Sequence, residues 1–173
     1  MKQLSPEWTQ NLETILKKEI KIYKDLLAIE DSKKTAIMNA EAKKIESLSQ
    51  ETQKHIQTAS DCETQRMTLI EKIYKQEKLE QAGDVPVLSE FLNQIDRQSN
   101  FRLKGLANDL KGVVGNLKEK ILINEKLLKT RHEIYSMSID ALKQASDIEM
   151  PSYEGNQSKA PKGRTSVLLN TQA

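Results

Sequence analysis

Apolar side chains recur in steps of three and four residues between Phe101 and Ala145, and no proline interrupts this segment. Such spacing is typical of an amphipathic helix that buries one stripe. At about 1.5 Å per residue the helix would be roughly 68 Å long, so it needs long partner helices to cover its stripe. The stripe consists of Leu103, Leu106, Leu110, Val113, Leu117, Leu128, Tyr135 and Leu142, with Lys120 and Asn124 at intervening positions.

A first helix is predicted over residues 6–37. Ser5 supplies a capping hydroxyl, and Pro6 stands at the first helical position, where its missing N–H costs nothing. The pattern loses phase near residues 38–42, where we expect a turn, with Asn39 as a cap for the next helix. A single helix running straight through is the alternative. The first stripe is Trp8, Leu12, Ile15, Ile22, Leu26 and Ile29, interrupted by Glu19.

A second helix is predicted over residues 40–81, followed by a short helix over 86–97 and the long helix over 100–146. The second helix is separated from the short helix by Gly83, Asp84 and Pro86. Residues 98–100 resemble a soft joint between the short helix and the long helix. The second stripe is thin, so its central part should pack weakly, because small and polar side chains remove little apolar surface from water. It consists of Ile45, Leu48, Thr52, His55, Ala59, Cys62, Arg66, Leu69 and Ile73.

Proline, glycine and polar residues dominate the sequence beyond residue 150, which predicts a flexible tail that folding does not require. We therefore expect an all-α protein, an elongated antiparallel helical bundle or coiled-coil hairpin over residues 1–150, with a disordered C-terminal tail over 151–173. Near its end the tail carries an apolar triplet, which either has no role or docks on a partner. The triplet is Val167, Leu168 and Leu169.

Charge and composition argue against several functions. Of 27 basic and 25 acidic residues, three basic and one acidic lie in residues 151–173, so the helical part is neutral and lacks the basic stripe of a nucleic-acid binder. One cysteine and two histidines at unsuitable spacing predict no metal site, no cofactor and no enzyme activity. We interpret Arg66 as a structural residue on the seam of the second helix. The N-terminus lacks a signal-peptide core and no apolar run is long enough to span a membrane, which favours the cytoplasm.

Three glycines interrupt the long helix, at positions 105, 112 and 115. Each costs about 1 kcal/mol relative to alanine. One interpretation is a helix that bends, frays or packs closely on a neighbour within the bundle. The other is a shallow trough that accepts a helix of a partner protein. Under that hypothesis the partner-binding residues are Gly105, Leu106, Leu110, Gly112, Val113, Leu117, Ile121, Leu127 and Leu128, together with Val167, Leu168 and Leu169 of the tail.

The order of these segments resembles the FlgN family of flagellar export chaperones over nearly the whole chain. Short motifs carry the resemblance in each long helix and in the tail. They are Tyr23 with Leu26 and Leu27, Glu63 with Arg66, Leu69 and Ile70, Asn124 with Leu127 and Leu128, and Tyr153 with Gly155.

The resemblance implies a cytoplasmic chaperone of the flagellar type III export system. Such a chaperone binds the C-terminal segments of hook-associated proteins of the FlgK and FlgL type, keeps them unassembled and delivers them to the export apparatus. It also implies that the last helix carries much of this binding. The residues alone indicate an interaction protein more broadly, and a structural coiled-coil scaffold is the alternative. The oligomeric state is left open.

Overall fold

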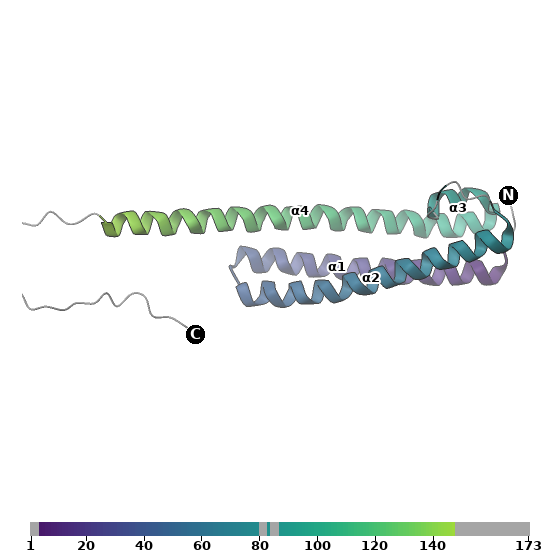
Figure 1. The fold of residues 1–173 in the computed structure, drawn as a ribbon, viewed down its shortest axis with the longest axis horizontal. Helices are drawn as coiled ribbons and strands as arrows, with labels where there is room; N and C mark the ends of the chain where they lie inside the picture. Colours follow the sequence, from purple (N-terminus) through teal and green to yellow (C-terminus); the bar gives the residue numbers. More distant parts are fainter. Residues whose placement is uncertain (1–3, 80–82, 84–86, 148–173) are drawn as a thin grey trace, which may run out of the picture. The chain divides into compact units, whose positions relative to one another are not determined.

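The chain folds into helices joined by short connections (Figure 1). The structure, a computed structural model, describes residues 4–79, 83 and 87–147, and side chains as far as residue 144. Helix α1 spans Pro6–Met38, α2 Ala42–Glu77, α3 Leu88–Gln94 and α4 Arg97–Asp147. No strand occurs in this described part, so the all-α prediction is confirmed. The predicted domain boundary at residue 150 and the tail lie outside the described residues.

The chain divides into two compact units, residues 1–135 and residues 136–173. In the first unit α1 and α2 form a hairpin and pack along one another. Helix α4 runs in the same direction as α1, because Thr9 contacts Ser99 near one end and Glu30 contacts Asn124 near the other. The long helices therefore run up, down and up, which is the predicted antiparallel bundle.

The turn between α1 and α2 lies where the hydrophobic pattern loses phase, but Asn39 does not cap α2. Asn39 instead ends α1, and its N–H donates to the Thr35 oxygen. Ala40 adopts a left-handed φ of 56°, and the N–H of Glu41 returns to the Ala36 oxygen. Satisfying these last carbonyls of α1 reverses the chain, and α2 then begins without a side-chain cap.

The second helix ends at Glu77, four residues before its predicted end. Lys78 adopts a left-handed φ of 49°, and the N–H groups of Lys78 and Leu79 both reach the Tyr74 oxygen. This closure stops the helix without glycine, so the sequence pattern extended it too far. The short helix α3 is likewise shorter than predicted, since Ile95 is extended after Gln94.

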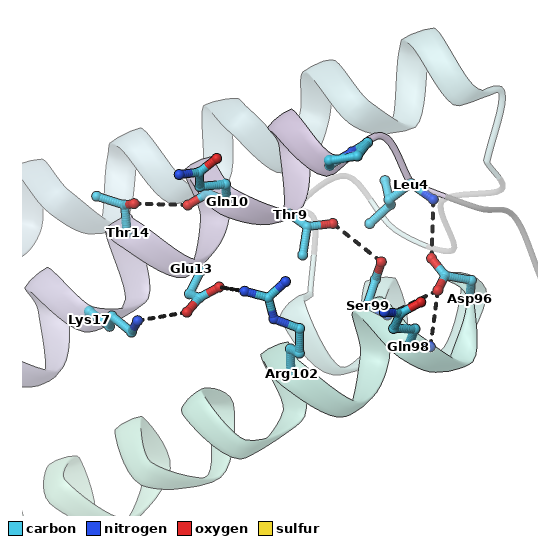
Figure 2. A pocket seen from close by; sticks show the side chains of 11 residues that line it. Leu4, Thr9, Gln10, Glu13, Thr14, Lys17, Asp96, Gln98, Ser99 and Arg102 are labelled. Atoms are coloured by element: carbon cyan, nitrogen blue, oxygen red, sulfur yellow. Dashed lines mark hydrogen bonds and ion pairs between the residues drawn. The ribbon is translucent and has the colours of Figure 1, made fainter.

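The long helix begins at Arg97 rather than residue 100, because Asp96 caps it. Asp96 Oδ1 accepts the N–H groups of Gln98 and Ser99, each at 3.0 Å, and Oδ2 accepts that of Leu4 at 3.2 Å. Figure 2 shows this carboxylate between the start of α4 and the segment that enters α1. The predicted soft joint at residues 98–100 is therefore the first turn of α4, and the joint itself lies at residues 95–96.

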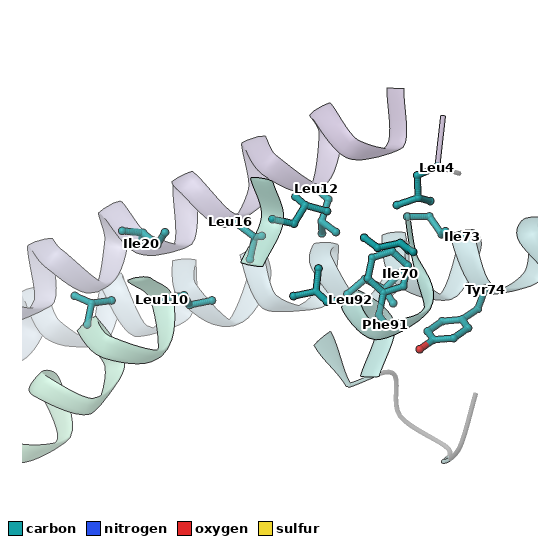
Figure 3. Close-up of a cluster of buried hydrophobic side chains, with 13 residues drawn as sticks. Leu4, Leu12, Leu16, Ile20, Ile70, Ile73, Tyr74, Phe91, Leu92 and Leu110 are labelled. Atoms are coloured by element: carbon teal, nitrogen blue, oxygen red, sulfur yellow. The ribbon is translucent and has the colours of Figure 1, made fainter. Parts of the chain in front are cut away.

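Two apolar clusters form the core of the first unit. The larger draws on all four helices and lies at the end where α3 closes the bundle (Figure 3). There the rings of Tyr74 and Phe91 meet edge to face with centroids 5.8 Å apart. The smaller cluster lies further toward the α1–α2 turn and contains small side chains of α2, in agreement with the thin stripe predicted there. It consists of Ile22, Leu26, Ala59, Cys62 and Leu117.

Candidate partner-binding surface on the long helix

The first half of the α4 stripe is part of the core. Leu103 is fully buried, and Leu110, Val113 and Leu117 are each 7% exposed. Leu106 and Ile121 are half-buried at its edges. The predicted partner-binding residues of this stripe therefore pack against this chain's own helices.

The three glycines lie on the outer side of α4. A Cβ added at Gly105, Gly112 or Gly115 would meet nothing within 4 Å. Gly112 lies about 200° around the helix from Leu110, because each residue turns an α-helix by about 100°. The interpretation that Gly112 packs inside the bundle is therefore wrong. The glycines and the leucine stripe lie on different sides of α4, so they do not line one trough.

The stripe of α4 changes character at Asn124, which is 5% exposed. Its amide nitrogen donates to the backbone oxygen and to Oε2 of Glu30 in α1, at 2.9 and 2.8 Å. Glu30 is itself buried, and its second carboxylate oxygen pairs with Lys33 at 2.8 Å. Asn124 therefore links α4 to α1 at the last position of the stripe that is buried among the described side chains.

Beyond Asn124 none of the described apolar side chains of α4 is buried, and most are exposed. The Arg131 guanidinium donates to the Met38 carbonyl at the last residue of α1, so residues 132–135 of α4 extend past that helix. Leu128 is 43% exposed and Tyr135 is 67% exposed, although both continue the buried stripe. Leu127 and Ile134, which are seven residues apart, border this side of the helix, about 100° from Leu128 and Tyr135. We call Leu127, Leu128, Ile134 and Tyr135 the distal apolar face.

Leu122, another exposed apolar residue of α4, points to a different side of the helix. Leu122 is 56% exposed and lies about 120° around the helix from Leu128. In the second unit, Met137 and Leu142 are exposed as well. The tail residues Val167, Leu168 and Leu169 lie outside the described residues. Of the predicted partner-binding leucines, only Leu127 and Leu128 therefore lie on the distal apolar face.

The sequence pattern predicted only part of an ion-pair cluster between α1 and α2. Arg66 lies on the α2 seam as predicted and pairs with Glu63 at 3.2 Å. It also lies 3.3 Å from Oε2 of Glu19 in α1, whose side chain is 1% exposed. Burial raises the pKa of Glu19, Arg66 opposes this and Glu63 adds to it. Glu19 and Arg66 both occupy stripe positions in the sequence, and that was the signal for their contact.

The described residues contain neither a cluster of metal ligands nor a membrane-spanning helix. No group of three or more histidine, cysteine, aspartate or glutamate side chains in the described part could hold a metal ion. Cys62 is a buried seam residue, as predicted, with its sulfur 3.7 Å from the Ile15 oxygen, and burial raises its thiol pKa. None of the described helices has the length and apolar character needed to cross a membrane.

Comparison with known proteins places the chain in a family. The model of the FlgN protein family matches residues 1–160. No curated protein matches the chain, and no solved structure does so either. Because the family match spans most of the 173 residues, the chain belongs to the FlgN family, and its general role is that of a flagellar export chaperone.

Proposed function

We propose that this chaperone acts in the cytoplasm and binds the C-terminal helical segments of hook-associated proteins of the FlgK and FlgL type. It keeps these clients unassembled and delivers them to the flagellar type III export apparatus. The observation that carries the proposal is the distal apolar face, where the stripe of α4 stays apolar but is no longer buried, alongside the last turns of α1 and past its end at Met38. In this arrangement the client covers the part of the α4 stripe that the chain's own helices leave exposed.

The spacing of the distal apolar face suits a helical client. Leu127 and Ile134 are seven residues apart, as are Leu128 and Tyr135, and a seven-residue step is one of the anchor spacings of helix-in-groove recognition. Burying two or three such side chains contributes about 1.5–3 kcal/mol each. A micromolar complex requires a binding free energy of about 8 kcal/mol. To reach this value, the distal apolar face needs a partner that buries an apolar stripe of its own against it, as an amphipathic helix does.

The remaining predicted partner-binding residues have different places in this proposal. Leu106, Leu110, Val113, Leu117 and Ile121 hold α4 in the bundle and support the distal apolar face indirectly. The glycine side of α4, with Gly105 and Gly112, and the tail triplet Val167–Leu169 would provide secondary contacts.

Two aspartate substitutions on the same helix test the proposal. Leu128→Asp places a charge on the distal apolar face, and Leu122→Asp places the same charge on another side of α4. The two side chains are exposed to a similar degree, 43% for Leu128 and 56% for Leu122, so both variants should unfold close to the wild-type temperature. Calorimetric titration with a purified C-terminal segment of a hook-associated protein should give one segment per chaperone. Leu128→Asp should weaken binding at least tenfold, and Leu122→Asp should leave it within about twofold.

Two outcomes would overturn the proposal. If Leu128→Asp bound the client segment as tightly as the wild type, the distal apolar face would not be the binding surface. If the wild type ignored the segment and instead self-associated into extended assemblies, the chain would be a scaffold.

A further inference from the structure

A pocket of about 340 Å³ lies between α3 and α4, away from the distal apolar face. Its apolar lining comes from both helices, with Leu92 buried at 5% exposure and Val87 at the rim with 46% exposure. Leu88 and Ala107 complete this lining. The pocket is large enough for an apolar side chain, since ligand pockets begin at about 300 Å³.

Lysines border this pocket and continue beyond it. Lys104 and Lys111 of α4 line the pocket, and Lys118 follows seven residues later. Residues seven apart lie nearly on one side of a helix, so the three exposed ammonium groups form a row. Within the part of the chain that the structure describes, no carboxylate pairs with any of the three. Asp109 lies about 200° around the helix from Lys111, so it does not neutralise the row.

We propose that the pocket and the lysine row form a docking site for an acidic amphipathic helix of a partner protein. One apolar side chain of that helix would enter the pocket between α3 and α4. Carboxylates at every seventh position would meet Lys104, Lys111 and Lys118, because seven residues rise by about 10.5 Å in both helices.

The lysine row and the apolar pocket contribute to recognition in different ways. Each exposed charge pair contributes only about 0.2–1 kcal/mol, but three pairs together add to the affinity, and complementary charge also speeds association and selects against basic partners. The apolar anchor slows dissociation, because its burial removes surface from water. The site does not depend on the client proposed above, because it lies on a different side of α4 and near the opposite end of the bundle.

Fluorescence anisotropy with a designed peptide tests the site. The probe is a labelled helical peptide of about 20 residues, blocked at both ends, with glutamates at every seventh position and one leucine between the first two. A control peptide has the same composition but places the glutamates on different sides of the helix. The full chain should bind the probe at least tenfold more tightly than the control peptide, and this preference should shrink as salt is added.

Matched variants locate the binding. Lys111→Glu and Val87→Asp should each weaken probe binding at least tenfold, whereas Lys126→Glu, an exposed lysine outside the row, should leave it within about twofold. A probe in which lysines replace the glutamates should bind Lys111→Glu more tightly than it binds the wild type. Circular dichroism should show that each variant keeps the wild-type helical content.

Several results would overturn the proposal. Equal binding of the probe and the control peptide would do so, as would probe binding that survives Lys111→Glu and Val87→Asp. Sedimentation that showed dimers dissociating in Lys111→Glu would mean that a second copy covers the row. Flotation with phosphatidylglycerol vesicles that depended on Lys111, with no binding of the probe, would mean that a lipid surface does so.

Discussion

Asn124 in α4 donates two hydrogen bonds to a single residue of α1, Glu30, one to its backbone oxygen and one to its carboxylate. Both side chains are buried, at 5% and 4% exposure. The contact lies between the buried half of the α4 stripe and the distal apolar face. It therefore marks the last buried position of the α4 stripe among the described side chains, and the apolar residues beyond it are open to a client.

Asn124→Ala should lower the free energy of unfolding by about 1–3 kcal/mol, because it leaves buried acceptors of Glu30 without their donor. Urea unfolding at pH 7 measures this loss. Asn116→Ala is the matched control, since Asn116 is exposed on the same helix and should change stability by less than about 0.5 kcal/mol. Equal stability of the two variants would show that the Asn124–Glu30 contact contributes nothing.

Arg66→Ala should destabilise the bundle because Glu19 would keep its buried position without the nearby guanidinium. Breaking such a pair costs about 3–5 kcal/mol when the remaining charge is fully buried. We expect a smaller loss, about 2 kcal/mol, since Glu19 can take up a proton. Thermal unfolding together with client titration checks this. A variant of wild-type stability that no longer binds client would instead place Arg66 in a binding site.

The buried carboxyl of Glu19 should also make stability depend on pH. Its pKa in the folded chain is raised above 4.5, primarily by burial, so the folded state holds the proton more tightly than the unfolded state. This contribution is complete below pH 4.5 and is lost as the pH rises through the raised pKa. The unfolding free energy of the wild type minus that of Glu19→Gln should therefore fall with rising pH.

Glu13→Gln is a control variant for this experiment, because the contribution of Glu13 to stability should change with pH in the opposite direction. A hydrogen bond from Lys17 is the largest cause that lowers the Glu13 pKa, and the charge of Arg102 also lowers it. Its contribution is present above the ordinary pKa and is lost as the pH falls. Urea unfolding of both variants between about pH 3 and pH 7 should give opposite slopes, because the Glu13 contribution changes mainly below pH 4.5 and that of Glu19 mainly above it. Parallel slopes would contradict the assignment for Glu19.

The sequence predicted the helices well but missed several of their ends, for a physical reason. Periodicity reports which side of a helix is apolar, and it located α1 to within one residue of its observed end. It does not report backbone conformations such as that of Lys78, a lysine in the left-handed region. Asp96 carried a usable signal, since an aspartate directly before a helix is a favoured cap.

The candidate site was predictable only in outline. The stripe of α4 was read correctly from Leu103 to Asn124, but the pattern cannot tell which of its apolar residues the chain itself covers. Their coverage depends on how far α1 extends along α4. The Arg131–Met38 contact shows that α1 ends beside Arg131 in the folded bundle. The glycines lie on another side of α4. They are close to the stripe residues in the sequence, but the two sets do not form one groove.

Gly112→Ala should stabilise the free protein. The added Cβ would meet nothing within 4 Å, and Gly112 lies within a continuous helix, so the variant gains helix propensity without a clash. The gain should be up to about 1 kcal/mol. For a chain of this size, that is a rise of about 2–4 °C in the melting temperature. A lower melting temperature would mean that the outer side of α4 is not open.

Gly112→Leu then asks whether a client uses the glycine side of α4. Open space around position 112 should accommodate leucine, so the variant should unfold at or above the wild-type temperature. If the client helix also lies against Gly112, the added side chain should weaken client binding at least tenfold, because it holds the two backbones apart. Wild-type affinity would confine the client to the distal apolar face. Leu122→Asp, measured beside it, separates loss of a close approach from a general effect of changing the outer side of α4.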